Sequence, residues 1–384
     1  MTRVPLFDLA AQEATVAAQA MDAIAAVVRE ATFIRGAHVE AFERWLARTT
    51  GAVHAVGVAS GTDAIELSLR ALGIGRGDAV VTPAFSFVAA AEAIAATGAR
   101  PVFCDVDPAT WSVTPRTIAH AVMRGRALGF RVRAAVPASL FGRCAVADDI
   151  RELGREEKLF VVEDAAQAFG ARDASGRAAG STAHIGCFSF FPTKALGAWG
   201  DGGAIITSDG DLASRVRRLG AHGAVAPFVH EELGRNSRLD AVQAAILLAK
   251  APHVDAWHAA RTRAAVRYIA AFAELPLGLP AVLAKPAVHA WQAFVVRVPS
   301  RRDELARWLR EHGIETRVYY PLPLHRQECF RSLAEPSLPE SEEACRTALA
   351  LPLFASITDA QQALVIEQVT TFFRRGSRGG EHGA

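Results

Sequence analysis

The stretch from Leu159 to Thr207 decides the fold, because three short apolar runs follow one another in it. The runs are Leu159-Phe-Val-Val-Glu163, Ile185-Gly-Cys-Phe-Ser-Phe-Phe191 and Ala204-Ile-Ile-Thr207. Short runs without polar alternation are typical of strands that are covered on both faces. Asp164 follows the first run, and Lys194 follows the second after Pro192-Thr193. In a parallel sheet, residues that follow strands lie at the edge where ligands bind.

Four further runs of the same kind lie upstream and alternate with helical patterns. The runs are Ala52–Val58, Ala79–Thr82, Pro101–Asp105 and Val132–Val136. The helical stretches are Thr62–Leu72, Phe87–Thr97, Thr114–Arg124 and Val146–Glu157. Strands that alternate with helices predict an α/β fold. We therefore expect a mainly parallel, seven-stranded sheet with helices on both faces.

The pattern changes downstream and predicts a second domain. Residues 211–273 read as helical, and the amphipathic segment Asp240–Lys250 is expected to cross between domains. The expected elements after it are strands at Trp291–Val298 and Gly313–Tyr320, and helices at Arg301–His312, Ser341–Ala350 and Thr358–Phe373. We predict a large domain over 1–250, a smaller α+β domain over 251–373 and a disordered tail over 374–384.

The composition excludes several classes of protein. The 384 residues carry a net charge of +2, so neither nucleic acid nor an anionic membrane is expected as a partner. Five scattered cysteines without a metal-ligand spacing favour a reduced cytoplasm and no metal site. The chain starts without the apolar core of a signal peptide, and no apolar run reaches the ~20 residues of a membrane helix. We expect a cytoplasmic protein.

Lysine is rare in this chain and narrows the search for a nucleophile. Only Lys158, Lys194, Lys250 and Lys285 stand against 38 arginines, and an arginine cannot form an imine. Three of the four lie at helix ends or in a loop and are interpreted as structural. Lys194 lies between an aromatic strand and a glycine-rich turn, where apolar surroundings lower the pKa of an amine and leave it nucleophilic. The alternative is a lysine that pairs or reaches solvent.

Asp164 suits the ring of one particular cofactor. A carboxylate at the end of a strand can keep a pyridine nitrogen protonated, and this protonation makes pyridoxal phosphate an electron sink. Gln167, one turn later, can hydrogen-bond the hydroxyl of the ring. Alternatively, Asp164 is an ordinary helix cap. Phe87, after the second predicted strand, can stack on a ring face, although most aromatics in such places are core residues.

A phosphate site is indicated where the first predicted strand meets its helix. Ser60-Gly61-Thr62-Asp63 opens the helix, whose free N–H groups can bind an anion. Thr62 and Ser189 can add hydroxyl donors. The same residue types are also common helix caps, so the stretch indicates a phosphate site only in combination with Lys194 and Asp164.

These residues together match the arrangement of fold-type-I pyridoxal phosphate enzymes, and the chain resembles the DegT/StrS-type nucleotide-sugar aminotransferases nearly from end to end. The matching stretches are Phe33-Ile-Arg-Gly, Ala59-Ser-Gly-Thr-Asp-Ala, Leu72-Gly-Ile-Gly-Arg-Gly-Asp, Pro101-Val-Phe-Cys-Asp-Val-Asp-Pro, Glu163-Asp-Ala-Ala-Gln-Ala, Phe188-Ser-Phe-Phe-Pro-Thr-Lys, Gly200-Asp-Gly-Gly-Ala and Asn236-Ser-Arg-Leu-Asp. The resemblance implies transfer of the amino group of L-glutamate to a keto sugar of a nucleotide-sugar, for a glycan or a natural product. The form of the motif around Lys194 resembles members that act at carbon 3 rather than carbon 4.

The resemblance also implies a role for each matching residue. Lys194 is expected to form the Schiff base with the cofactor and to move the proton, while Asp164 pairs with the ring nitrogen. The other cofactor-binding residues implied are Gly61, Thr62, Phe87, Gln167, Ser189 and Asn236. In this family the asparagine of the Asn-Ser-Arg motif reaches the neighbouring subunit, which implies a homodimer with shared active sites. The positions implied to face the substrate are Tyr320, His325 and Arg238.

The sequence departs from the family pattern at two places, and we expect both departures to change how the sugar is recognised. Ala195 follows the lysine where asparagine is common, and Pro227-Phe228 precede His230 where Lys-Tyr is common.

Alternative functions are a pyridoxal-phosphate-dependent sugar dehydratase and a non-catalytic regulator that binds cofactor or sugar nucleotide. Lys194 argues against the dehydratase, since similar dehydratases carry histidine there. A hydride-transfer enzyme is disfavoured, because Gly73-Ile-Gly-Arg-Gly follows a helix rather than a strand.

Overall fold

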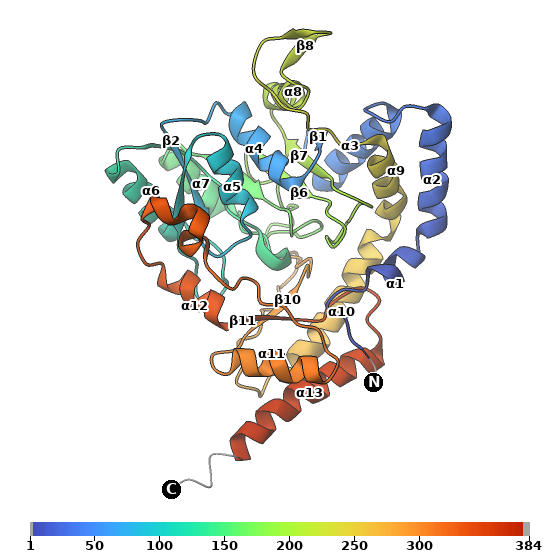
Figure 1. Ribbon diagram of the computed structural model, residues 1–384, viewed down its shortest axis with the longest axis vertical. Coiled ribbons are helices and arrows are strands. Elements are labelled where there is room, and N and C mark those ends of the chain that lie inside the picture. Colours follow the sequence, from blue (N-terminus) through green and yellow to red (C-terminus); the bar gives the residue numbers. More distant parts are fainter. Residues whose placement is uncertain (1–2, 379–384) are drawn as a thin grey trace.

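The computed structural model describes residues 3–378 and has a large sheet-based unit and a smaller unit below it in Figure 1. The strands are β1 (His54–Val58), β2 (Asp78–Pro83), β3 (Arg100–Cys104), β4 (Arg131–Ala135), β5 (Phe160–Asp164), β6 (Ile185–Ser189), β7 (Gly203–Thr207), β8 (Ala224–Ala226), β9 (Val229–His230), β10 (Phe294–Arg297) and β11 (Ala348–Leu351). The α-helices are α1 (Leu9–Ala14), α2 (Ala17–Glu30), α3 (Ala37–Thr50), α4 (Gly61–Ala71), α5 (Ala89–Ala96), α6 (Pro115–Ala127), α7 (Asp148–Glu156), α8 (Gly210–Leu219), α9 (Ala241–Lys250), α10 (Val254–Phe272), α11 (Arg302–Glu311), α12 (Pro339–Thr347) and α13 (Asp359–Arg378). Four short 3-10 turns are η1 (Leu140–Gly142), η2 (Ala251–His253), η3 (Leu324–Arg326) and η4 (Glu328–Leu333).

The large unit is built on the expected seven-stranded sheet, which confirms the predicted α/β class. The strand order is β1-β7-β6-β5-β4-β2-β3. The neighbours from β6 to β3 pair in parallel, and β7 alone runs antiparallel to both of its neighbours. Because β1 and β6 are each antiparallel to β7, they run in the same direction as each other. The carboxyl ends of β1, β5 and β6 therefore meet at one edge of the sheet.

Helices cover both faces of the sheet, as the uninterrupted apolar runs require. On one face, α4, α5 and α8 pack on residues such as Val56 and Ile205. On the other face, α3 and α9 pack on Ala55 and Ile206, while α6 and α7 cover the far strands. Successive residues of a strand point to opposite faces, so neighbouring positions enter different cores. The burial of both faces leaves only the strand ends available for a ligand.

The smaller unit has its own core around the antiparallel pair β10 and β11, with α10, α11 and α13 packed on it. Val4 also lies in this core, although residues 1–250 were assigned to the large domain. Helix α10 joins the two units, since Trp257 packs in the core of the large unit and Tyr268 in the core of the small one. The expectation that Asp240–Lys250 makes this crossing is wrong, because α9 packs entirely in the large unit.

Four further sequence predictions differ from the structure. The helical reading of residues 211–273 is wrong around Pro227, where β8 and β9 form the hairpin that projects at the top of Figure 1. The strand expected over 313–320 is absent from the described chain, because Ile314 and Arg317 each make only a single bridge to different partners. The helix expected over 341–350 ends at Thr347, since the next residues pair with β10.

The last difference concerns the C-terminal end. Residues 374–378 belong to α13, so the expectation of disorder is wrong for them. The remainder of the predicted tail, residues 379–384, lies outside the described part. Among residues 3–378, no helix combines the length and the apolar character that are needed to cross a membrane.

Candidate active site

A cavity of about 470 Å³ opens at the sheet edge where β1, β5 and β6 end. This volume suits a cofactor together with part of a substrate. Eight of the residues singled out in the sequence line it together: Gly61, Thr62, Phe87, Asp164, Gln167, Ser189, Lys194 and Tyr320. Asp164 and Lys194 thus share one cavity, although 29 residues separate them in the chain. The cavity also contains residues that the sequence did not single out, among them Gln292 and Tyr319.

The phosphate-binding turn is formed where β1 enters α4. The Ser60 hydroxyl accepts the N–H of Asp63 at 3.1 Å and caps the helix. The N–H groups of Gly61 and Thr62, at the first two helical positions, have no acceptor within the helix. A Cβ on Gly61 would lie 2.7 Å from the Ser189 Cβ, so only glycine lets the turn approach the end of β6 this closely. The arrangement places a helix N-terminus and two hydroxyls around one wall of the cavity, which suits an anion.

Asp164 and Lys194 modify each other's protonation inside the cavity. Asp164 is only 8% exposed, and burial raises the pKa of its carboxyl. The hydrogen bond from the Ala166 N–H, at 3.1 Å, and the charge of Lys194 lower this pKa and oppose the effect of burial. Burial lowers the pKa of the Lys194 amine, and the Asp164 charge opposes this effect. A lowered pKa increases the neutral, nucleophilic fraction of the amine. The carboxylate accepts a single hydrogen bond in the described chain, which leaves lone pairs for a charged donor in the cavity.

The pKa of Lys194 can be tested without any cofactor. We expect competitive acetylation of the apoprotein, read by peptide mass spectrometry against pH, to give Lys194 a midpoint below the ordinary lysine value of about 10.4. Asp164→Asn should lower the midpoint further, because it removes the negative charge that stabilises the ammonium. A lysine-containing peptide in the same tube is the reference. A midpoint at or above that of the peptide would contradict the burial argument.

The loop that carries Lys194 is held from both sides by one glutamine. Gln292 donates from Nε2 to the Thr193 carbonyl at 2.9 Å and accepts the Ala195 N–H on Oε1 at 2.9 Å. It therefore brackets the backbone of Lys194 with two hydrogen bonds. Gln292 lies two residues before β10 of the small unit, so both units fix the position of the lysine. The sequence contains no local signal for this contact.

We expect Gln292→Ala to lower kcat by about 10²-fold, because a displacement of about 1 Å at a reacting group costs this much. Gln243→Ala is the matched control, since the Gln243 side chain accepts the N–H of Trp199, farther along the same loop, at 2.9 Å. Both variants lose an amide contact to the loop and should lose similar thermal stability. Equal kcat values in the two variants would show that Gln292 has no special role beside Lys194.

A buried ion pair supports the same loop from the other side. Lys250 is fully buried and donates to Glu13 Oε1 at 2.6 Å and to the Gly197 carbonyl at 2.7 Å. Trp199 donates its indole N–H to the other oxygen of Glu13. Lys250 thus serves as a structural residue, as interpreted from the sequence. Its hydrogen bond to the Gly197 carbonyl, in the Lys194 loop, could not be predicted from the sequence, because the two positions lie 53 residues apart in the chain.

Aromatic and amide side chains form the opposite wall. Gln167 accepts the Phe141 N–H at 2.9 Å and donates to the Tyr320 hydroxyl at 3.0 Å, so its orientation is set. Burial raises the pKa of the Tyr320 hydroxyl and keeps it protonated. Phe87 is 54% exposed, with its ring centroid 6.3 Å from that of Tyr320. An aromatic ring left this exposed at the cavity is available for stacking.

Three of the singled-out residues lie outside this cavity. Asn236 is exposed and Arg238 half-buried, and neither lines the cavity of its own chain. The His325 side chain is fully buried in η3, and its Nε2 pairs with Glu342 at 2.9 Å. The expectation that His325 contacts substrate is therefore not supported by its position, because a buried imidazole facing Glu342 presents no atom to the cavity.

The cavity fits pyridoxal phosphate. The helix N-terminus suits a phosphate, the buried Asp164 carboxylate suits a ring N–H, and Lys194 offers an amine of lowered pKa. The glycine at 61 leaves room for the approach. Within residues 3–378, no cluster of histidine, cysteine and acidic side chains is able to hold a metal ion.

Comparison with known proteins supports this interpretation. The profile of the DegT/DnrJ/EryC1/StrS aminotransferase family matches residues 15–370. A "pleiotropic regulatory protein" of Geobacillus stearothermophilus is 41% identical over 97% of this chain and 99% of its own. The UDP-N-acetyl-3-dehydro-alpha-D-glucosamine 3-aminotransferase of Acidithiobacillus ferrooxidans is 39% identical over 98% and 99%. The crystal structure of S. venezuelae DesV in complex with a ketimine intermediate superimposes with a TM-score of 0.92, at 39% identity, over 97% of this chain and 99% of that one.

The matches confirm the family, the fold type, the aminotransferase class and the pyridoxal phosphate that were expected from the sequence. They extend over nearly the whole of each chain, and they agree with a cavity in which a lysine, a buried aspartate and a helix N-terminus converge. The chain belongs to the DegT/DnrJ/EryC1/StrS aminotransferase family.

Proposed function

We propose that this enzyme transfers the amino group of L-glutamate to a keto sugar of a nucleotide-sugar, at carbon 3 in preference to carbon 4. The observation that carries the proposal is the shared cavity of Lys194 and Asp164 beside the N-terminus of α4. The Acidithiobacillus relative, named for amination of a 3-dehydro sugar, supports the choice of carbon. The Phe-Phe-Pro-Thr-Lys form around Lys194 supports it as well.

The proposed roles follow from the position of each residue. Pyridoxal phosphate, when bound, supplies an electron sink that acidifies the carbon bearing the amino group. Gly61, Thr62 and Ser189 bind its phosphate, and Phe87 stacks on its ring. Asp164 keeps the ring nitrogen protonated, and Gln167 orients the ring through its hydroxyl. Lys194 would hold the cofactor through its amine, and the amino group of the substrate would displace Nζ from it. The freed Nζ would then remove the proton and return it.

The experiment that tests this function pairs glutamate with a panel of acceptors. Purified enzyme is incubated with L-glutamate and with 3-keto and 4-keto nucleotide-sugars, and products are read by mass spectrometry. We expect a 3-amino product together with 2-oxoglutarate. A 4-amino product would contradict the preference for carbon 3. Absence of any amino sugar across the panel would contradict the substrate class.

We propose further that two copies of the chain form shared active sites. Asn236 is exposed and forms a bridge with Ala221, just before β8, and it does not line the cavity of its own chain. Phe228 at the hairpin tip is 97% exposed, and Leu233 is 92% exposed. Apolar side chains this exposed on a projecting hairpin are typical of a surface that packs on a partner. Asn236 would then reach the cofactor phosphate of the second copy, with Arg238 and Tyr320 facing the substrate.

Mixing two inactive variants tests the shared site. Lys194→Ala and Asn236→Ala homodimers each carry two defective sites. A mixed dimer has one doubly defective site and one intact site if Asn236 acts across the interface. Random exchange should therefore restore about one quarter of wild-type activity, since half of the dimers are mixed and each has one intact site. Lys194→Ala mixed with Asp164→Asn is the control and should recover nothing, because both residues serve the cavity of their own chain.

The Geobacillus relative bears the name of a regulator, so the chemical competence of this chain needs its own measurement. Enzyme loaded with pyridoxal phosphate should release one 2-oxoglutarate per site from L-glutamate, without an acceptor. A sensor that only binds would release none. A dehydratase is disfavoured by the presence of Lys194.

A further inference from the structure

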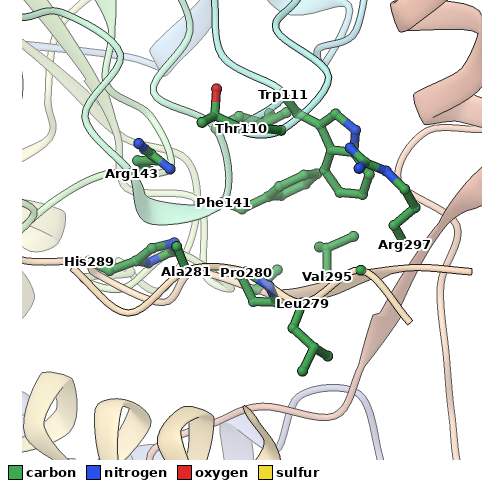
Figure 2. A pocket seen from close by; sticks show the side chains of 14 residues that line it. Thr110, Trp111, Phe141, Arg143, Leu279, Pro280, Ala281, His289, Val295 and Arg297 are labelled. Atoms are coloured by element: carbon green, nitrogen blue, oxygen red, sulfur yellow. The ribbon is translucent and has the colours of Figure 1, made fainter. Parts of the chain in front are cut away.

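A second cavity, of about 80 Å³, lies between the two units and outside the cofactor site (Figure 2). Large-unit loops around Trp111 and η1 form one side, and small-unit segments around Leu279 and His289 form the other. It holds more than a single water molecule, which needs about 10–15 Å³. No step of the proposed transamination uses this space.

The lining of this cavity carries positive charge and no acidic residue. Arg143 and Arg297 line it, and none of the lining side chains is Asp or Glu. The Arg143 guanidinium makes no hydrogen bond or ion pair with any residue of the described chain, so all five of its N–H donors are available. Asp107 belongs to the loop that carries Ala109 and Thr110 but does not line the cavity, and its Oδ1 accepts the N–H groups of these two residues and the Thr110 hydroxyl.

His289 adds a neutral donor at the same end as Arg143, as Figure 2 shows. Its Nδ1 accepts the N–H of Trp291 at 2.9 Å, which leaves the proton on Nε2. Burial, with a smaller effect from Arg143, lowers the pKa of His289 to about 3. The ring is therefore uncharged at neutral pH, and it offers an N–H to an acceptor without adding a second full charge beside Arg143.

The other end of the cavity is apolar and aromatic. Trp111, Phe141, Leu279 and Pro280 line it. The Arg297 guanidinium lies 4.9 Å from the centroid of the Trp111 ring and donates to the Pro108 carbonyl, so it is already engaged. Its charge still adds to the positive field of the cavity. The site thus combines free N–H donors at one end with flat apolar surfaces at the other.

We propose that this cavity binds a small oxyanion with an aromatic or apolar body, with Arg143 and His289 holding the charged group. The body would lie against Trp111 and Phe141. The site is separate from the cofactor cavity, which shares only Ala293 with it. Phe141 forms the partition, since its ring lines this cavity and its N–H binds Gln167 of the other.

Isothermal titration of the pyridoxal-phosphate-loaded enzyme tests the proposal, because loading fills the other anion site. The probes are benzoate, phenyl phosphate and acetate. We expect benzoate or phenyl phosphate to bind, the tighter of the two identifying the preferred headgroup, and acetate to bind more weakly. Arg143→Gln should weaken the tighter probe about 10-fold or more, since a hydrogen bond to a charged group is lost.

Arg116→Gln is the matched control, because it removes the same charge from an exposed position of α6 that does not line the cavity. It should bind as the wild type does. Ala281→Asp is a second variant, at an exposed lining position, that should repel an anion without disturbing the core. Absence of binding to the wild type, equal affinity in the two arginine variants, unchanged affinity in Ala281→Asp, or acetate binding as tightly as benzoate would each overturn the proposal.

Discussion

Lys194→Ala is expected to lower turnover by about 10⁴-fold or more, the largest effect of any single substitution proposed for this enzyme. The change removes both the amine that holds the cofactor and the base that moves the proton. No neighbouring group can replace it, because Lys194 is the only lysine among the residues that line the described cavity. The measurement is single-turnover amination, with borohydride reduction and peptide mapping of the wild type to locate the cofactor on the chain.

Lys285→Ala is the control for this experiment, since Lys285 is exposed and does not line the cavity. It should retain wild-type turnover and reducible cofactor. Mapping of the cofactor to any peptide other than the one with Lys194, or substantial turnover by Lys194→Ala, would remove the basis of the proposed mechanism.

Asp164→Asn is expected to lower kcat by about 10²–10³-fold while the cofactor stays bound. Removal of one buried electrostatic partner of a developing charge has effects of this size. The amide preserves the shape of the side chain and can still accept the Ala166 N–H through its oxygen. It lacks the negative charge that favours a protonated ring nitrogen, so the ring withdraws electrons less well. The measurement is kcat with saturating cofactor, together with a titration of cofactor binding.

A cofactor analogue distinguishes this explanation from general damage to the site. Pyridoxal phosphate methylated on its ring nitrogen carries a fixed positive charge and needs no partner to keep it. It should restore much of the activity of Asp164→Asn relative to the normal cofactor. An equal defect with both cofactors would show that Asp164 acts through the shape of the site and not through its charge.

The site was predictable from the sequence where its residues follow strands. Asp164 ends β5, Ser189 ends β6, and Ser60–Thr62 follow β1, so local patterns placed them all at one edge of the sheet. Lys194 was found because lysine is rare here and because its neighbours are apolar or glycine. The structure turns His325 toward Glu342 and not toward the cavity, and its position in the sequence alone does not show this orientation.

Contacts between distant segments gave no such local signal. Gln292 is a single glutamine before a short strand, and only the packing of the small unit brings its amide to both sides of Lys194. The Ala348–Leu351 segment fits a helical pattern equally well, and the availability of β10 as a partner made it a strand. A segment that fits both a helix and a strand becomes a strand where the fold places another strand beside it.

By itself, then, the sequence determined the sheet, the chemistry of the lysine and aspartate, and the helix N-terminus for a phosphate, since each depends on neighbours a few residues away. Tertiary structure alone decided which side chains hold the Lys194 loop, that His325 is buried, and that Arg143 and His289 face a second cavity. The physical reason is that burial and hydrogen bonding across units depend on how whole elements pack, and no window of sequence contains both partners of such a contact.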